Sequence, residues 1–265
     1  MSGLSLAQLD VLLVEPSTTQ GHIVQGYLDR LGMAHHRRVA GAAEALSAMA
    51  SRLPDVVISS MHLPDASGTE LLQNMRADEQ LAEIAFILIS SETSRRYLEP
   101  LRQAGVTAIL PKPFSRQQLR GALEATLDYL EPEPLELASF SPDELRVLIV
   151  DDSFTSRRIV RRMLEGMGVE DFTEAENGRE AIERIGEQFF DLIVTDYHMP
   201  EVDGEQLSRF IRNESTQPGV PVLMVTSERD DSRLAAVQQS GVSALFDKPL
   251  STGTLRQAVQ RLLAE

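Results

Sequence analysis

Short apolar runs alternate with amphipathic stretches along the chain, and this alternation predicts strands and helices in turn. Runs rich in branched residues are typical of strands buried in a parallel sheet. In the C-terminal half they predict strands at 146–150, 172–174, 192–196, 221–225 and 243–246. Helices are predicted at 153–167, 177–187, 207–211, 234–239 and 255–262. Such alternation favours a parallel sheet with helices on both faces.

The pattern repeats within the chain. Only two of the 25 basic residues are lysines, Lys112 and Lys248, and they lie 136 positions apart (248 − 112). The same offset relates the apolar runs 11–14 and 147–150, and it recurs at glycine and proline positions without drift. The sequence therefore predicts two copies of one domain, at residues 1–130 and 145–265. Residues 131–144 hold three prolines, five acids and no basic residue, and predict an acidic linker.

Composition narrows the classes of function. The chain has no cysteine, which excludes disulfides, cysteine-ligated zinc and thiol catalysis. The net charge is −15, and no basic patch favours binding to nucleic acid. No apolar stretch resembles a signal peptide or is long enough to span a membrane. We therefore expect a cytoplasmic protein that binds neither nucleic acid nor membranes.

Polar side chains follow the predicted strands of the second copy. Asp151-Asp152 follows the first strand, Asp196 ends the third, Thr226 follows the fourth and Lys248 follows the fifth. The carboxyl ends of parallel strands meet at one edge of the sheet, where ligands bind. Clustered carboxylates suit Mg²⁺ or Mn²⁺, while a hydroxyl and an ammonium group stabilise an anion. Each residue alone has a structural interpretation, because Asp often caps helices and Lys-Pro often forms turns. Together they indicate phosphoryl transfer onto a carboxylate.

These motifs resemble those of receiver domains in bacterial two-component response regulators. The similarity rests on the stretches 150–153, 155–160, 174–178, 195–200 and 226–228, and is greatest to the chemotaxis regulator that binds the flagellar switch. It covers the second copy from Leu145 onward and, more weakly, residues 8–130. The resemblance implies a flavodoxin-like (βα)5 fold in each copy, an α/β fold with a five-stranded parallel sheet of order 2-1-3-4-5.

The resemblance also implies a role for each residue. Asp196 accepts a phosphoryl group from a histidine kinase or phosphotransfer domain. Mg²⁺, for which Mn²⁺ can substitute, is bound by Asp151, Asp152, Asp196 and the backbone carbonyl of His198. Thr226 moves toward the phosphoryl group and Lys248 pairs with it.

Further positions near this site also follow from the resemblance. The Lys248-Pro249 bond is expected to be cis. His198 and Glu228 flank the site and tune phosphate loss, although a solvated loop residue explains His198 equally well. Leu245 stands where receivers usually carry an aromatic residue that swings inward, which puts that coupling in doubt. A packing role for Leu245 remains the alternative.

The first copy lacks the acceptor. At the offset of 136, Ser60 replaces Asp196, Glu15-Pro16 replaces the acid pair, Ser90 replaces Thr226, and Lys112 is kept. A serine cannot form an acyl phosphate, and two carboxylates are missing from the metal site. We expect this copy not to be phosphorylated and to act as a binding or dimerisation module, with a homodimer as one outcome. Lys112 is expected to pair with Glu15.

The resulting hypothesis is a response regulator without an output domain, which signals to a downstream protein by contact. It is not an enzyme beyond its own phosphorylation and dephosphorylation. Two alternatives stay open, a phosphate sink for a kinase and a scaffold that works without phosphorylation. A phosphatase of the haloacid dehalogenase type is disfavoured, since that family needs an acid where His198 stands. Nucleotide binding is disfavoured because no glycine-rich loop follows either first strand.

Overall fold

The structure is a computed structural model, and it describes residues 4–92, 95–138, 141–227, 237 and 239–264. The chain divides into two compact units, Met1–Glu131 and Pro132–Glu265. Each unit is described by itself below. Among the described residues, no helix combines the length and the apolar character needed to cross a lipid bilayer.

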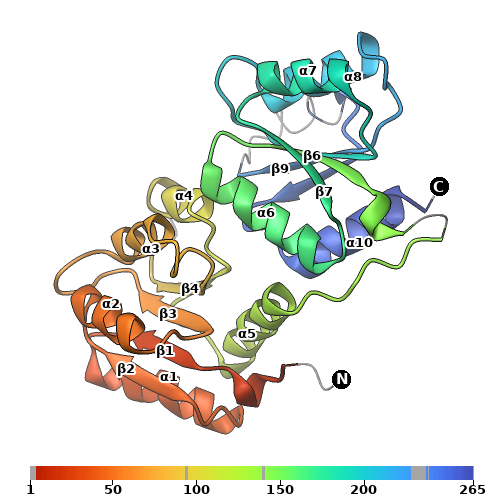
Figure 1. The fold of residues 1–265 in the computed structure, drawn as a ribbon. Helices are drawn as coiled ribbons and strands as arrows, with labels where there is room; N and C mark the ends of the chain where they lie inside the picture. Colours follow the sequence, from red (N-terminus) through yellow and green to blue (C-terminus); the bar gives the residue numbers. More distant parts are fainter. Residues whose placement is uncertain (1–3, 93–94, 139–140, 228–236, 238, 265) are drawn as a thin grey trace. The chain divides into compact units, whose positions relative to one another are not determined.

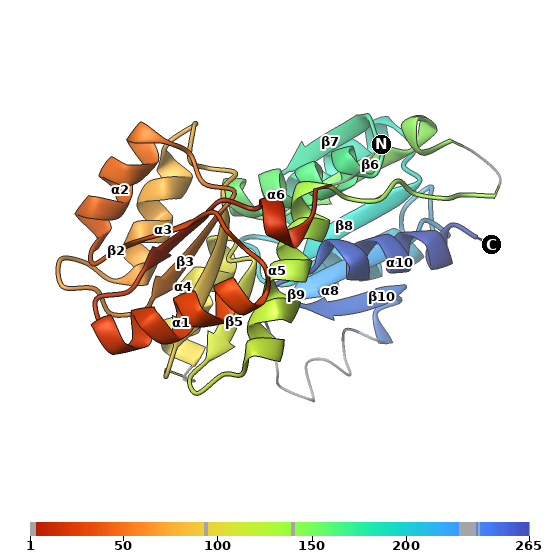
Figure 2. The same cartoon turned by 90° about the horizontal axis from the view of Figure 1, so that it is seen from below.

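The first unit is a parallel sheet covered by helices on both faces (Figure 1). Its strands are β1 (Val11–Val14), β2 (His36–Val39), β3 (Val56–Ser60), β4 (Ala85–Ser90) and β5 (Ala108–Pro111). Its helices are α1 (Thr18–Arg30), α2 (Ala42–Ser51), α3 (Gly68–Ala77), α4 (Arg95–Gln103) and α5 (Arg116–Leu130), preceded by the 3-10 turn η1 (Leu6–Gln8). The strand order is β2-β1-β3-β4-β5. Helices α1 and α5 cover the face that is nearer in Figure 2.

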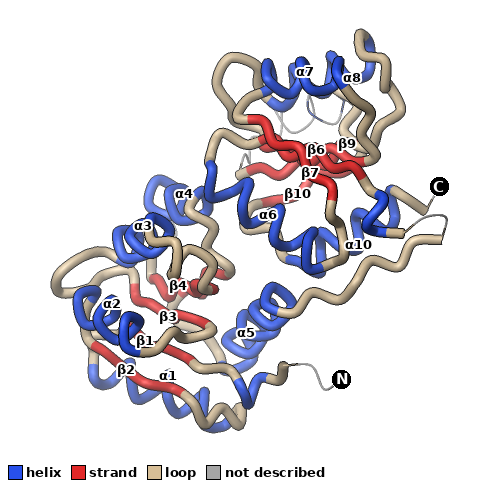
Figure 3. Tube along the Cα trace, viewed as in Figure 1, coloured by secondary structure: helices blue, strands red, loops and turns tan. Residues whose placement is uncertain are grey.

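The second unit repeats this arrangement, as the alternation of strands and helices along the tube shows (Figure 3). Its strands are β6 (Arg146–Val150), β7 (Asp171–Ala175), β8 (Leu192–Asp196), β9 (Val222–Thr226) and β10 (Ala244–Asp247). Its helices are α6 (Phe154–Gly166), α7 (Gly178–Glu187), α8 (Gly204–Asn213) and α10 (Thr252–Leu262), and η2 (Pro142–Glu144) precedes β6. The strand order is β10-β9-β8-β6-β7. Read from β7, with β6 to β10 numbered 1 to 5, this is the order 2-1-3-4-5. The predicted fold is confirmed in both copies, while the predicted helix 234–239 falls largely outside the described residues.

The strand registers carry the same internal offset as the sequence. Val11 of β1 lies opposite Val56 of β3, and Val147 of β6 lies opposite Leu192 of β8. Each residue of the second pair stands 136 positions after its counterpart in the first pair. Equivalent residues of the two units therefore occupy equivalent places at the sheet edges, which allows the two sites to be compared residue by residue.

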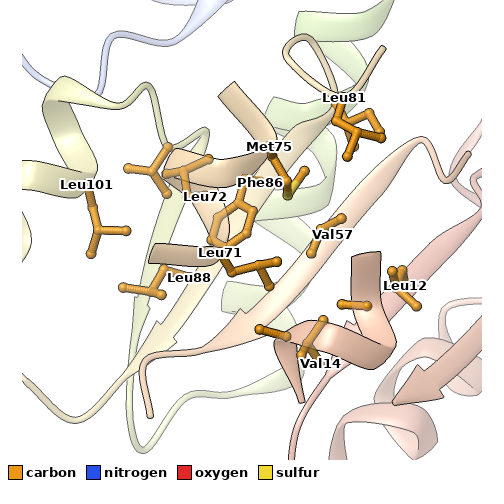
Figure 4. Packing of buried hydrophobic residues seen from close by; sticks show 14 of the residues in the cluster. Leu12, Val14, Val57, Leu71, Leu72, Met75, Leu81, Phe86, Leu88 and Leu101 are labelled. Atoms are coloured by element: carbon orange, nitrogen blue, oxygen red, sulfur yellow. The ribbon is translucent and has the colours of Figure 1, made fainter. Parts of the chain in front are cut away.

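The core of the first unit surrounds Phe86 of β4 (Figure 4). Its ring lies among Leu71, Leu72 and Met75 of α3 and Val57 of β3, all of which are buried. The equivalent of Phe86 in the second unit is Val222, which is also fully buried. Both sheets thus present apolar side chains to the helices, and the polar residues collect where the strands end.

The acidic segment between the copies packs locally against the second unit. Leu135 is buried, and its backbone N–H donates to the carbonyl of Met167 at 3.0 Å. Glu133 forms an ion pair with Arg256 of α10.

Candidate functional site

Four strands bring the acidic and basic residues of the second unit to one edge of its sheet. Asp151 follows β6, Asp196 is the last residue of β8, Thr226 is the last of β9, and Lys248 follows β10. These four residues are buried, while Asp152 is exposed. The strand order places β8 between β6 and β9, so Asp196 lies in the middle of the set.

Lys248 binds two of the carboxylates directly. Its Nζ lies 2.9 Å from Oδ2 of Asp151 and 2.9 Å from Oδ1 of Asp196. The backbone N–H of Lys248 donates to the carbonyl of Thr226 at 2.8 Å, which ties the loop after β10 to the end of β9. An ammonium group is thereby held beside the acceptor expected from the sequence. The Lys248-Pro249 bond is cis, as predicted.

The carboxylates outnumber the cation that faces them. Ligand atoms of Asp151, Asp152 and Asp196 lie within 4.8 Å of one another. The buried Oδ2 of Asp196 has no hydrogen-bond partner among the described residues. Three close carboxylates with one unsatisfied oxygen suit a hard divalent cation such as Mg²⁺, which prefers oxygen ligands. The donor set therefore fits the ion that the sequence predicted.

Burial and charge shift the proton affinities of this cluster. Burial raises the pKa of Asp196 to about 6, although the charge of Lys248 opposes the shift. Burial likewise raises the pKa of Asp151 above its usual value, again against Lys248. Burial disfavours the ammonium form of Lys248, but the two aspartates outweigh it and raise the pKa of that amine. Without a further cation, the negative charge of the cluster is costly.

Local backbone contacts hold the end of β8 in place. The N–H of Gly204, at the start of α8, donates to the carbonyl of Tyr197 at 2.9 Å. A Cβ on Gly204 would collide with the carbonyl oxygen of Asp196, so only glycine permits this close approach. The hydroxyl of Thr195 donates to the same carbonyl at 2.9 Å. The backbone of Asp196 is thus fixed from two sides.

The flanking residues are placed as follows. His198 is exposed in the loop after β8, with its ring edge-on to Tyr197 at 4.6 Å. Metal binding by its carbonyl stays a prediction. Leu245 packs against the small cluster formed by Tyr197, Met224 and Val237, which supports a packing role for that position. Glu228 lies outside the described residues.

In the equivalent site of the first unit, the one carboxylate is satisfied by neighbouring groups of the protein. The hydroxyl of Ser60 donates to Oε2 of Glu15, and Nζ of Lys112 lies 3.3 Å from the same oxygen. The other oxygen, Oε1, accepts from the N–H of Ser17 at 2.9 Å. Ser90 ends β4, and its hydroxyl accepts from the N–H of Glu92. One carboxylate faces one ammonium group here, and both of its oxygens are used.

One residue at the rim of the second site has no role predicted from the sequence. Arg157 of α6 is buried, and its Nη1 donates to the carbonyl of Asp151 at 2.7 Å. A signal existed in the repeat, because the equivalent of Arg157 is Gly21 and the equivalent of Glu174 is Arg38. A paired replacement of this kind indicates contact between the two positions.

The response regulator receiver domain family matches residues 11–124 and 147–260. The chain belongs to this family and carries two of its domains in tandem. Chemotaxis protein CheY-3 of Vibrio cholerae is 34% identical over 118 residues, which cover 44% of this chain and 91% of the relative. Chemotaxis protein CheY of Pseudomonas aeruginosa is 33% identical over 118 residues, which cover 44% of this chain and 95% of the relative.

Two solved structures of receiver proteins are each similar to a stretch about one unit long. Chemotaxis response regulator CheY4 of Vibrio cholerae is 31% identical, with a TM-score of 0.42 over 45% of this chain and 98% of that one. The receiver domain of sensor histidine kinase PA1611 from Pseudomonas aeruginosa, a structure with magnesium coordinated in its active-site cleft, is 24% identical. Its TM-score is 0.43 over 46% of this chain and 98% of that one.

Membership of this family places the chain in two-component signal transduction. Receiver domains are regulatory modules and not conventional enzymes. They bind Mg²⁺ in general, and they interact with histidine kinases and with downstream targets.

Proposed function

We propose that the second unit accepts a phosphoryl group on Asp196 from a phosphohistidine of a kinase or phosphotransfer domain, and that the first unit does not. One observation carries the proposal: Asp196 has one carboxylate oxygen 2.9 Å from Lys248 Nζ and the other buried without a partner among the described residues. An oxygen held in this way is oriented and remains available as a nucleophile.

In the transfer, an oxygen of Asp196 attacks phosphorus, the new O–P bond forms, and the N–P bond of the donor breaks. The electron pair of that bond stays on the histidine nitrogen. Lys248 neutralises charge on the phosphoryl oxygens, and the Thr226 hydroxyl hydrogen-bonds to them. Asp151, Asp152, Asp196 and the carbonyl of His198 would hold Mg²⁺, which supplies charge neutralisation for the acidic cluster and the phosphoryl group.

The test uses the full chain with Mg²⁺ and acetyl phosphate, followed by intact-mass measurement. We expect one labile phosphoryl adduct on the wild type and on Ser60→Ala, and none on Asp196→Asn. An adduct that persists in Asp196→Asn would place the acceptor elsewhere. A folded wild type that gains no adduct would contradict the proposal and favour a scaffold that works without phosphorylation.

The output follows from the same chemistry. Phosphorylation of Asp196 shifts the second unit between two conformations, and the shifted form is recognised by a downstream protein. The closed Glu15–Ser60–Lys112 site supports a first unit that works without phosphorylation, as a binding or dimerisation module. A phosphorylation-dependent change in the oligomeric state or in partner capture, absent from Asp196→Asn, checks this part of the proposal.

A further inference from the structure

In each unit, an arginine side chain donates a hydrogen bond to the backbone carbonyl of the first residue after the first strand. In the second unit it is the carbonyl of Asp151, which accepts from Nη1 of Arg157 at 2.7 Å. In the first unit it is the carbonyl of Glu15, the equivalent residue, which accepts from Nε of Arg38 at 3.1 Å. This carbonyl lies at the edge of the sheet that carries the site, directly after β6 or β1.

The two arginines reach this carbonyl from opposite elements. Arg157 lies on helix α6, whereas Arg38 lies on strand β2. The equivalent of Arg157 is Gly21, and a Cβ there would lie 2.6 Å from Nη1 of Arg38, so the helix has made room for the strand-borne guanidinium. The arginine has changed elements between the units while its contact with the carbonyl has been kept.

In the second unit the guanidinium is held on three sides. Nε of Arg157 donates to Glu174 at 3.1 Å and Nη2 donates to Glu176 at 3.2 Å. The ring of Phe154 lies 5.8 Å from the guanidinium carbon. The planar guanidinium of Arg157 is buried and donates to three acceptors, which are Glu174, Glu176 and the carbonyl of Asp151. These contacts restrict the guanidinium to one orientation, and the guanidinium in turn fixes the direction of the Asp151 carbonyl.

The carbonyl of Asp151 belongs to the peptide unit that joins Asp151 to Asp152. Fixing it restricts the backbone from which both carboxylates extend, and Oδ1 of Asp151 is held further by the N–H of Ser153 at 2.8 Å. Groups that orient metal ligands through hydrogen bonds contribute strongly to metal affinity.

We propose that Arg157 is a positioning residue, which sets the affinity of the Asp151–Asp152–Asp196 cluster for Mg²⁺ by fixing the Asp151 carbonyl. The inference rests on the metal site of the proposed function. It also implies that this role can be moved from helix to strand within the second unit, as it has been between the units.

The test measures Mg²⁺ affinity of the full chain by isothermal titration calorimetry, with no phosphoryl donor present. We expect Arg157→Ala to weaken binding by about tenfold. The double variant Arg157→Gly/Glu174→Arg, which copies the first unit, should return to within about threefold of the wild type. Arg161→Ala is the matched control, because Arg161 also binds Glu174, at 3.3 Å, from the same helix. It should stay within about twofold of the wild type.

An affinity of Arg157→Ala within about twofold of the wild type would overturn the inference, even if that variant were less stable. A folded double variant that does not recover the affinity would also overturn it. If Arg157→Ala does not fold, the double variant decides alone, and its failure to fold would show a structural role only. A wild type that binds no Mg²⁺ would refute the proposed metal site itself, and the inference with it.

Discussion

The two units differ in how the carboxylates at the edge of the sheet are neutralised. In the first unit, one carboxylate, one ammonium group and one hydroxyl satisfy one another, so the site is complete without a ligand. In the second unit, three carboxylates face one ammonium group, and a buried oxygen of Asp196 has no partner among the described residues. The second unit therefore keeps an excess of negative charge at this edge, whereas the first unit has fewer carboxylates and satisfies them with its own side chains.

The largest expected effect is a gain of phosphorylation in the first unit when its missing acids are restored. Glu15→Asp, Pro16→Asp and Ser60→Asp together rebuild the acid set of the second unit around Lys112. In an Asp196→Asn background, the triple replacement should gain an Mg²⁺-dependent adduct with acetyl phosphate, measured by intact mass. Ser60→Asp alone should gain none, since position 16 then lacks a ligand. A phosphoryl adduct on the variant with Ser60→Asp alone would show that the first site needs only an acceptor to resemble the second.

The next effect tests what the two units share. Arg76 and Arg212 are equivalent, and each donates to backbone carbonyls in the segments that precede two neighbouring strands. The acceptors are Ala82, Ile84, Ala104 and Gly105 for Arg76, and Pro218, Val220 and Gly241 for Arg212. Replacement of either by alanine should cost its own unit about 2–4 kcal/mol, because several part-buried carbonyls lose a charged donor.

Hydrogen exchange followed by mass spectrometry assigns each loss to one unit. Arg209→Ala is the control, since the exposed side chain of Arg209 makes only an ion pair with Glu205 of the same helix among the interactions described. It should change stability by less than about 0.5 kcal/mol. A loss in one unit but not the other would show that the shared fold is stabilised differently in the two copies.

A smaller effect concerns the cost of the charged site. In the presence of a chelator at neutral pH, Asp196→Asn should stabilise the second unit by on the order of 1–2 kcal/mol, because burial disfavours the charged carboxylate. Ser60→Asp should destabilise the first unit by introducing the same charge beside Glu15. Urea denaturation with exchange readout measures both. A destabilised Asp196→Asn would show that Lys248 fully compensates the acid cluster.

The smallest effect concerns how the second helix of each unit begins. Asp65 reaches back to α2, where it accepts from the N–H groups of Ala42 and Ala43, both at 2.8 Å. In the second unit Asn177 caps α7 with its own side chain, at 3.0 Å from the N–H of Glu180. The backbone N–H groups of Ala43 and Ala42, with that of Ala43 contributing most, lower the pKa of Asp65 below 3.8.

A lowered pKa in the folded state gives stability that is present above pH 3.8 and is lost as the pH falls through the lowered value. Asp65→Asn should therefore destabilise the first unit slightly at pH 6, and the difference from wild type should shrink on acidification. Asn177→Ala is the control, because its effect on the second unit does not involve a titrating group. A pH-independent effect of Asp65→Asn would contradict the charged cap.

The sequence by itself determined the two copies and the residues at each sheet edge, and the strand order 2-1-3-4-5 followed from the resemblance of its motifs to receiver domains. Strand patterning and a constant offset of 136 are local and additive properties, and parallel connections leave few topologies. The order of Asp151, Asp196, Thr226 and Lys248 along the strands was sufficient to place them at one edge. The pairing of Lys112 with Glu15 also followed from the charges that remained in the first copy.

Only the tertiary structure decided how those groups share their partners. The contact of Lys248 with two carboxylates and the unpartnered oxygen of Asp196 depend on side-chain orientation, which residue spacing does not encode. The repeat signals a contact between positions 157 and 174, but only the folded structure shows that Arg157 and Arg38 donate to equivalent carbonyls. Such contacts join residues that are distant along the chain, and packing alone brings them within hydrogen-bond distance.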